Sequence, residues 1–158
     1  MEKFAALQKF LEEKNLVPGG KFDAWIEGGE ITRIGKDTPE GFHLLDYEYV
    51  AVFDFEECKQ HPLFITSLVQ CWLTDNDTGR RDEILGKVKM NITQESKGCH
   101  SIDVQIKFKE AAYIYQDDNG HIPYKGKMWT GGAVAAAIVE GFELEETWLM
   151  SVLILKTC

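Results

Sequence analysis

The chain has 158 residues, enough for one well-buried core, so one compact domain is expected. Its composition, 44% hydrophobic and 27% charged, is that of a globular protein and argues against a disordered, collagen-like or repeat architecture. The formal charge of −9, with no basic run longer than Arg80-Arg81, argues against tight binding to nucleic acid.

The first expected elements are a helix, a strand and a turn. Apolar residues recur at helical spacing before NLVPGG and predict a helix from about Glu2 to Asn15: Phe4, Leu7, Phe10 and Leu11. In KFDAWIEGG, apolar and mostly polar residues alternate, which predicts a strand from Lys21 to Glu27. Gly28-Gly29 follows and predicts a hairpin turn before EITRIG.

A long half-buried strand then leads directly into a second helix. Within FHLLDYEYVAVFDFEE the odd positions from 45 to 55 are apolar: Leu45, Tyr47, Tyr49, Ala51, Phe53 and Phe55. Pro62 stands where a first helical residue tolerates the missing N–H, and the helix continues until DNDTG. Its expected buried side consists of five residues: Leu63, Phe64, Leu68, Cys71 and Trp72.

Two further alternating segments predict a second hairpin, with its turn at ESKGC. The apolar positions are Val88, Met90 and Ile92, then Ile102, Val104, Ile106 and Phe108. The order α-β-β-α-β-β predicts an α+β fold with an antiparallel or mixed sheet and helices packed on one face. The strand residues expected to face both helices are Tyr47, Tyr49, Phe53, Val104, Ile106 and Phe108. After a turn-rich segment that closes on Trp129, the sequence assigns no element.

No residue pattern indicates catalysis, and we expect no enzymatic activity, no metal and no cofactor. The four histidines lie in or beside predicted turns and strand ends, outside any nucleophile or zinc-protease motif: His43, His61, His100 and His121. A zinc site from Cys58, His61, Cys99 and His100 is disfavoured, because adjacent ligands on an extended chain point in opposite directions. Carboxylates of the long strand could form an acid–base pair, but the solvent side of the sheet is the favoured place for them: Asp46, Glu48, Asp54 and Glu56.

Four aromatic residues are candidates for contacts between subunits: Trp25, Tyr113, Tyr115 and Trp129. A stripe of aromatic residues along the strands has two explanations, an interface or core packing, and core packing is favoured: Phe53, Phe55, Tyr113 and Tyr115.

Neither the cysteines nor the apolar C-terminal run indicates export or a membrane span. Four widely spaced cysteines do not suggest a disulfide framework: Cys58, Cys71, Cys99 and Cys158. No signal peptide precedes MEKFAALQKF, so free thiols in a reducing cytoplasm are expected. Glutamates interrupt the run GGAVAAAIVEGFELEETWLMSVLIL and make its insertion into a bilayer costly.

The segments FDAWIEGGEI, FHLLDYEYVAVFDFEE, HPLFITSLVQCWLTDND and SIDVQIKFKEAAYIYQDDNGHIPY resemble, in this order, the tail completion or tail terminator proteins of tailed bacteriophages and prophages. DYEY and CWLTDND carry most of the resemblance, which covers about Phe22 to Trp129. It implies an α+β fold without enzymatic activity. It also implies a ring, usually a hexamer, that caps the tail tube where the tube meets the head. Residues 1–129 are therefore expected to form one tail-terminator-like domain, and residues 130–158 an extension without a counterpart.

The resemblance further implies three partners: other copies of the chain, the tail tube and the head–tail connector. Assembly in the bacterial cytoplasm and residence in the virion tail follow from it. The expected end strands, Lys21 to Glu27 and His100 to Tyr115, would offer unpaired backbone groups to a neighbouring subunit. The alternative is a cytosolic module, unrelated to phage, that binds a small ligand or acts as an adaptor.

Overall fold

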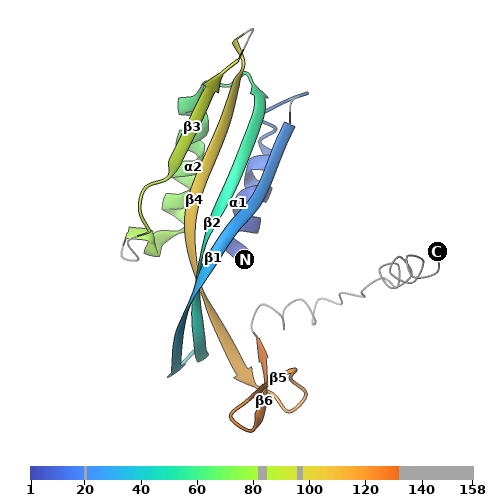
Figure 1. The fold of residues 1–158 in the computed structure, drawn as a ribbon, viewed down its shortest axis with the longest axis vertical. Helices are drawn as coiled ribbons and strands as arrows, with labels where there is room; N and C mark the ends of the chain where they lie inside the picture. The colour runs from blue at the N-terminus through green and yellow to red at the C-terminus, as the bar shows by residue number, and fades with distance from the viewer. Residues whose placement is uncertain (20, 82–84, 96–97, 132–158) are drawn as a thin grey trace, which may run out of the picture. The chain divides into compact units, whose positions relative to one another are not determined.

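The computed structural model describes residues 1–19, 21–81, 85–95 and 98–131 (Figure 1). The chain divides into two compact units. The first comprises residues 1–34 and 45–111, and the second comprises residues 35–44 and 112 onward. Helices and strands both contribute, so the predicted α+β class is confirmed. The elements are α1 (Glu2–Glu13), β1 (Lys21–Thr38), β2 (Gly41–Cys58), α2 (Pro62–Asn76), the 3-10 turn η1 (Thr78–Arg81), β3 (Lys89–Gln94), β4 (His100–Gln116), β5 (Ile122–Tyr124) and β6 (Lys127–Gly131).

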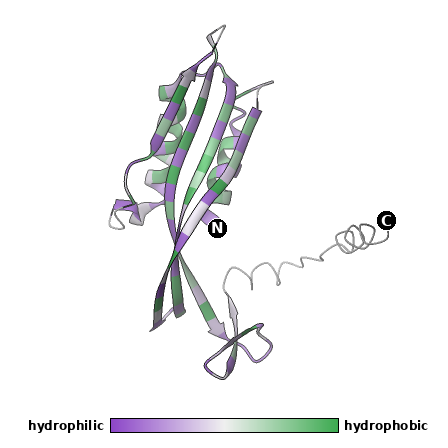
Figure 2. Ribbon diagram, in the orientation of Figure 1, coloured by the Kyte–Doolittle hydropathy of each residue, from purple (hydrophilic) through white to green (hydrophobic). Residues whose placement is uncertain are grey.

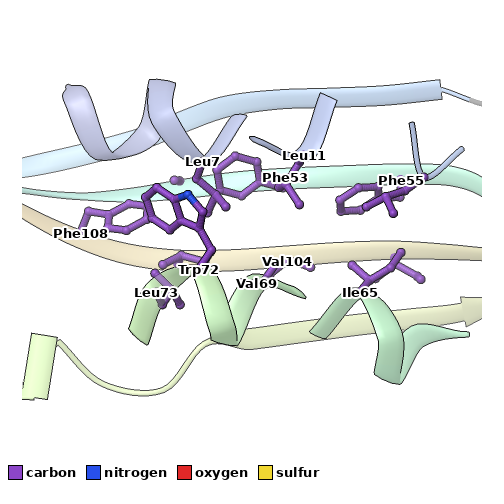
Figure 3. Close-up of a cluster of buried hydrophobic side chains, with 14 of the residues drawn as sticks. Leu7, Leu11, Phe53, Phe55, Ile65, Val69, Trp72, Leu73, Val104 and Phe108 are labelled. Carbon is purple, nitrogen blue, oxygen red and sulfur yellow. The ribbon is translucent and has the colours of Figure 1, made fainter. Parts of the chain in front are cut away.

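The core of the first unit joins both helices to one face of the sheet (Figure 3). In this unit β2 lies between β1 and β4, and β3 pairs with the other side of β4. Side chains of one alternating set are buried on the two central strands: Tyr49, Ala51, Phe53 and Phe55 on β2, and Ile102, Val104, Ile106 and Phe108 on β4. The burial expected for Tyr49, Phe53 and the three β4 residues is therefore confirmed, whereas Tyr47 is only half-buried.

Hydrophilic and hydrophobic residues alternate along the strands of this unit (Figure 2). Helix α1 contributes Leu7 and Leu11 to the core, and its Phe4 ring lies 5.7 Å from the ring of Phe53. Strand β1 contributes Phe22, whose ring lies 4.9 Å from that of Phe55. The alternating apolar residues of the strands and the helically spaced apolar residues of α1 thus pack together in one layer.

The buried side of α2 differs from the expected one. The helix begins as predicted at Pro62, and the ring Nδ1 of His61 accepts a hydrogen bond of 3.2 Å from the Leu63 amide. Two of the five expected residues are correct, since Trp72 is buried and Leu68 packs partly buried against the core. Leu63 and Phe64, however, are 67% and 48% exposed, and Cys71 is also exposed. The buried residues are Ile65, Val69, Trp72 and Leu73. Apolar residues occur on more than one side of α2, so helical spacing allowed two different buried rows, one with Phe64 and one with Ile65. Contact with the sheet decides which row is buried.

The hairpin turn predicted at Gly28-Gly29 is wrong. Strand β1 continues through both glycines to Thr38, and the turn to β2 lies at Pro39 and Glu40. Gly28 has a φ of +65°, and a Cβ on Gly29 would stand 2.5 Å from the Tyr47 ring. Gly28 therefore allows a positive φ, and Gly29 allows the Tyr47 ring of β2 to approach closely, within one continuous strand.

The second predicted hairpin is confirmed. Strands β3 and β4 pair antiparallel, from Lys89 opposite Gln105 to Gln94 opposite His100. Met90 and Ile92 oppose Val104 and Ile102, so they lie on the core face of the sheet.

The second unit contains a hairpin that the sequence did not predict. Strands β5 and β6 pair with each other, and β6 also pairs with the end of β4, where Ile114 opposes Gly131. The rings of Phe42, Tyr124 and Trp129 form a cluster, with Phe42 5.4 Å from Tyr124 and 5.7 Å from Trp129. Of the expected extension over residues 130–158, only residues 130 and 131 are described, as the end of β6.

Replacing Phe53 by alanine should lower the free energy of unfolding by about 3–5 kcal/mol, because the fully buried ring leaves a cavity between α1 and β2. Urea denaturation measures the change. Phe64→Ala is the matched control, since Phe64 is half exposed, and it should cost less than about 1 kcal/mol. Equal effects of the two substitutions would contradict the described core.

Candidate assembly surfaces

A buried carboxylate fixes the junction of α1, α2 and β4. Asp77 ends α2, and its side chain is fully buried. Its Oδ1 accepts a hydrogen bond of 2.7 Å from Lys3 Nζ, and its Oδ2 accepts one of 3.0 Å from Arg80 Nη1. Two cations thus compensate one buried anion, which is the condition for a charge to remain inside a protein.

The same two cations bond the backbone of β4 beyond its pairing with β3. Strand β3 pairs with β4 only as far as Gln105. Farther along β4, the Lys107 carbonyl oxygen accepts a bond of 2.7 Å from Arg80, and the Lys109 carbonyl oxygen accepts one of 2.9 Å from Lys3. Side chains from η1 and α1 therefore bond β4 carbonyls past the end of the β3 pairing.

Glu110 binds the amino end of α1. Its carboxylate accepts hydrogen bonds from the amides of Glu2 (2.9 Å) and Lys3 (3.1 Å) and from the hydroxyl of Tyr49. Burial, together with this hydrogen bond to Glu110, raises the pKa of the Tyr49 hydroxyl. A residue 107 positions away in sequence thus caps α1, in place of a local capping residue.

Asp77→Ala should lower the free energy of unfolding by about 3–5 kcal/mol, because it leaves the cations of Lys3 and Arg80 without their shared anion. Thermal and urea denaturation report the loss. Asp75→Ala, two residues earlier on the exposed side of α2, should change the stability by less than about 0.5 kcal/mol. A variant at Asp77 as stable as the Asp75 control would show that the junction does not depend on the carboxylate.

The other face of the sheet carries ion pairs between strands. Lys109 bonds Asp46 at 2.9 Å, and Lys107 bonds Glu48 at 2.5 Å. The hydrogen bond to Glu48 raises the pKa of Lys107. Asp46 is buried beside its partner, so this carboxylate is less solvated than the strand pattern predicted.

Asp54 stands among other acidic groups on the same face. Burial raises its pKa, and repulsion from Glu56 and Asp103 raises it further. A carboxyl group whose pKa is raised by folding stabilises the protein when protonated and loses this contribution as the pH rises through its folded pKa. At neutral pH the ionised Asp54 therefore destabilises the fold.

Asp54→Asn should raise the free energy of unfolding at pH 7, by less than about 1 kcal/mol because solvent screens this partly exposed group. The gain over the wild-type protein should shrink as the pH falls toward 3, where the carboxyl group is neutral in both states. Urea denaturation across this pH range measures the difference. Asp118→Asn, in an exposed turn, is the control and should show no such trend; a gain at Asp54 that does not depend on pH would contradict the assignment.

The four aromatic interface candidates divide between the two units. Trp25 lies on β1 in the first unit, 41% exposed, and its Nε1 donates a bond of 3.2 Å to Glu27. Tyr113, Tyr115 and Trp129 belong to the second unit, where Tyr113 stacks on His43 and Tyr115 is 42% exposed. Trp129 packs in the aromatic cluster of that unit, and its Nε1 donates to the Tyr124 carbonyl oxygen at 2.9 Å.

The edges of the sheet differ from the expected ones. Strand β1 is an edge, as predicted, but His100–Tyr115 is not an end strand. Within the described residues β4 pairs with β2 on one side and with β3 and β6 on the other, so β3 forms the second edge of the first unit. The sequence suggested the β3–β4 hairpin but gave no signal for which of its strands pairs with β2.

An open cavity of about 770 Å³ runs along α2 toward β3. Hydroxyl, amide and basic side chains contribute to its lining, among them Thr66, Gln70, Thr74, Arg81 and Lys87. If the chain were the cytosolic module of the alternative interpretation, this cavity is a place where it could bind a small ligand.

The described residues contain no group of three or more histidine, cysteine or acidic side chains placed to hold a metal ion. Cys58 is buried, and its burial raises the pKa of the thiol, whereas Cys99 is half-buried. Over the described part of the chain, no helix has the length and apolar character that crossing a bilayer requires.

Comparison with known proteins gives one family. The model of the P2 phage tail completion protein R (GpR) family matches residues 1–133, which include every described residue of both units. Searches of curated proteins and of solved structures find no match to the chain.

Proposed function

The chain belongs to the P2 phage tail completion protein R (GpR) family, and from this membership we propose that it caps or completes the tail tube and helps to join the tail to the head. The family match over residues 1–133 is the observation that carries the proposal. The family is structural rather than enzymatic, and a role in the virion tail follows from it.

We propose that the protein acts as a ring of identical subunits, six in number. The first unit has two different edge strands, β1 and β3, at opposite sides of its sheet (Figure 1), and among the described residues neither has a strand partner on its outer side. Two different surfaces that bind each other make a head-to-tail contact, and such contacts close into a ring when the rotation permits. The free edges therefore support a ring over a two-fold dimer.

The proposed partners are other copies of the chain, the tail tube and the head–tail connector proteins, met during assembly in the bacterial cytoplasm. The net charge of −9 supports a ring through which DNA passes without adhering. We also propose that residues 1–129 act as the assembly domain, with both helices on one sheet face so that the edges remain free, and that residues 130–158 are an extension of it.

Deleting the gene from the phage or prophage that carries it should leave tails that fail to join heads, and the wild-type gene in trans should restore complete particles. Electron microscopy of purified particles counts joined tails, and gold labelling of a tagged copy should mark the tube end. Native mass spectrometry at high protein concentration should show a hexamer.

Complete, head-joined tails in the deletion strain would refute the function in tail completion. Protein that remains monomeric at every concentration and is absent from the tube end would refute the ring. Both results together would favour the alternative, a cytosolic module that binds a small ligand or acts as an adaptor. Ligand binding at the cavity beside α2 would be its next test.

A further inference from the structure

We propose that neighbouring subunits join by antiparallel pairing of β1 from one copy with β3 from the next, residues 22–27 against residues 89–94. This inference rests on the proposed ring and specifies its contact. Both strands end the sheet of the first unit, and each lacks a strand neighbour on its outer side within the described residues. Such an edge presents backbone N–H and C=O groups that another strand can bind.

The direction of the two strands suits the contact. In Figure 1, β1 and β4 run one way, and β2 and β3 run the other way. When two copies stand side by side in the same orientation, β1 of one therefore lies antiparallel to β3 of the other. Antiparallel pairing can then extend the sheet without turning either copy over.

The two faces of the strands also match. Ala24 and Ile26 on β1 pack against the core of their own subunit, and Met90 and Ile92 on β3 lie on the core face of theirs. If Glu27 stands opposite Lys89, then Ile26 stands opposite Met90, and Ala24 opposite Ile92. This register places apolar residues together on the helix side, where they continue the core from one subunit to the next.

The register also covers exposed apolar surface. Ile92 is 51% exposed in the single chain although its strand partner, Ile102, is fully buried. Trp25 is 41% exposed on the opposite face of β1 and would stand opposite Asn91. Large apolar side chains that are exposed in a single chain are typical of surfaces that a partner covers.

The register also places an acidic side chain opposite a basic one. Residues 22–27 contain Asp23 and Glu27, but Asp23 already forms an ion pair of 2.6 Å with Lys21, so Glu27 is the acidic group that β1 offers to a partner here. Residues 89–94 contain Lys89 and no acidic residue; Lys87 lies before them and Glu95 directly after them. Pairing of β1 with β3 therefore brings Glu27 to Lys89, whereas pairing of β1 with a second β1 would bring acidic residues of the two strands together.

The contact is small, since each strand contributes six residues. A single pair of this size binds weakly, but every subunit of a closed ring makes two such contacts, so closure strengthens the assembly. Weak pairing between free subunits fits a protein that becomes a ring at high concentration or on the end of a tube.

Charge reversal tests the pairing. Glu27→Lys and Lys89→Glu should each raise the protein concentration at which half of the subunits assemble about tenfold, and the double variant should return it to within about threefold of the wild-type value. Sedimentation velocity across a concentration series measures assembly. Glu13→Lys and Lys59→Glu are matched reversals at exposed positions outside both edges and should leave assembly unchanged. Equal loss in these controls, or no rescue in the double variant, would overturn the pairing.

A disulfide trap tests the register directly. Two proteins, Asp23→Cys and Thr93→Cys, are prepared with Cys71, Cys99 and Cys158 replaced by serine, and are oxidised together at the concentration where rings form. Residues directly opposite in an antiparallel pair have Cα atoms about 4.5–5.5 Å apart, within reach of a disulfide, so a mixed dimer should form. Asp23→Cys mixed with Lys9→Cys, an exposed position on α1, should give no dimer above background.

The outcomes separate this inference from the proposed function. Rings without the mixed disulfide would overturn the β1–β3 contact and leave the ring intact. Rings absent under all conditions, including on purified tail tubes, would overturn both. Rings together with the mixed disulfide and the charge rescue would support both.

Discussion

The buried carboxylate of Asp77 connects α1, α2 and η1 beside the part of β4 that β3 does not pair with. It lies between Lys3 of α1 and Arg80 of η1, and both cations also bond carbonyl oxygens of β4 past the end of the β3 pairing. A hydrophobic layer alone does not fix the positions of two helices along a sheet, because apolar contacts have little directional preference. Paired charges and backbone hydrogen bonds supply that direction.

The sheet of the first unit has one face packed in the core, and β1 and β3 are its edges within the described residues. Helices α1 and α2 both pack on the face that carries Phe53 and Phe108, while cross-strand ion pairs such as Lys107 with Glu48 occupy the other face. Sheet edges are normally protected because they invite pairing with other chains. The assembly proposed for this member of the tail completion family would use such edges.

The errors of sequence interpretation have one origin. Gly28-Gly29 has the composition of a hairpin turn, yet Gly29 is required by the Tyr47 ring of the neighbouring strand, 2.5 Å from where a Cβ would stand. Helix α2 has two apolar rows, and the sheet selects the row with Ile65 and Val69 rather than the row with Phe64. In both cases the deciding contact comes from a residue distant in sequence, which local periodicity does not contain.

The sequence by itself determined the class of fold, the residues of the central strands that are buried, and the order of motifs that identifies the family. These properties depend on alternation and helical spacing, which are local and repeat over many residues. Only the tertiary structure decided that β3 rather than β4 forms the second edge, that Glu110 caps α1, and that Asp77 is buried between two cations. Each of these depends on a single long-range contact, and the free energy of such a contact depends on geometry that no local pattern encodes.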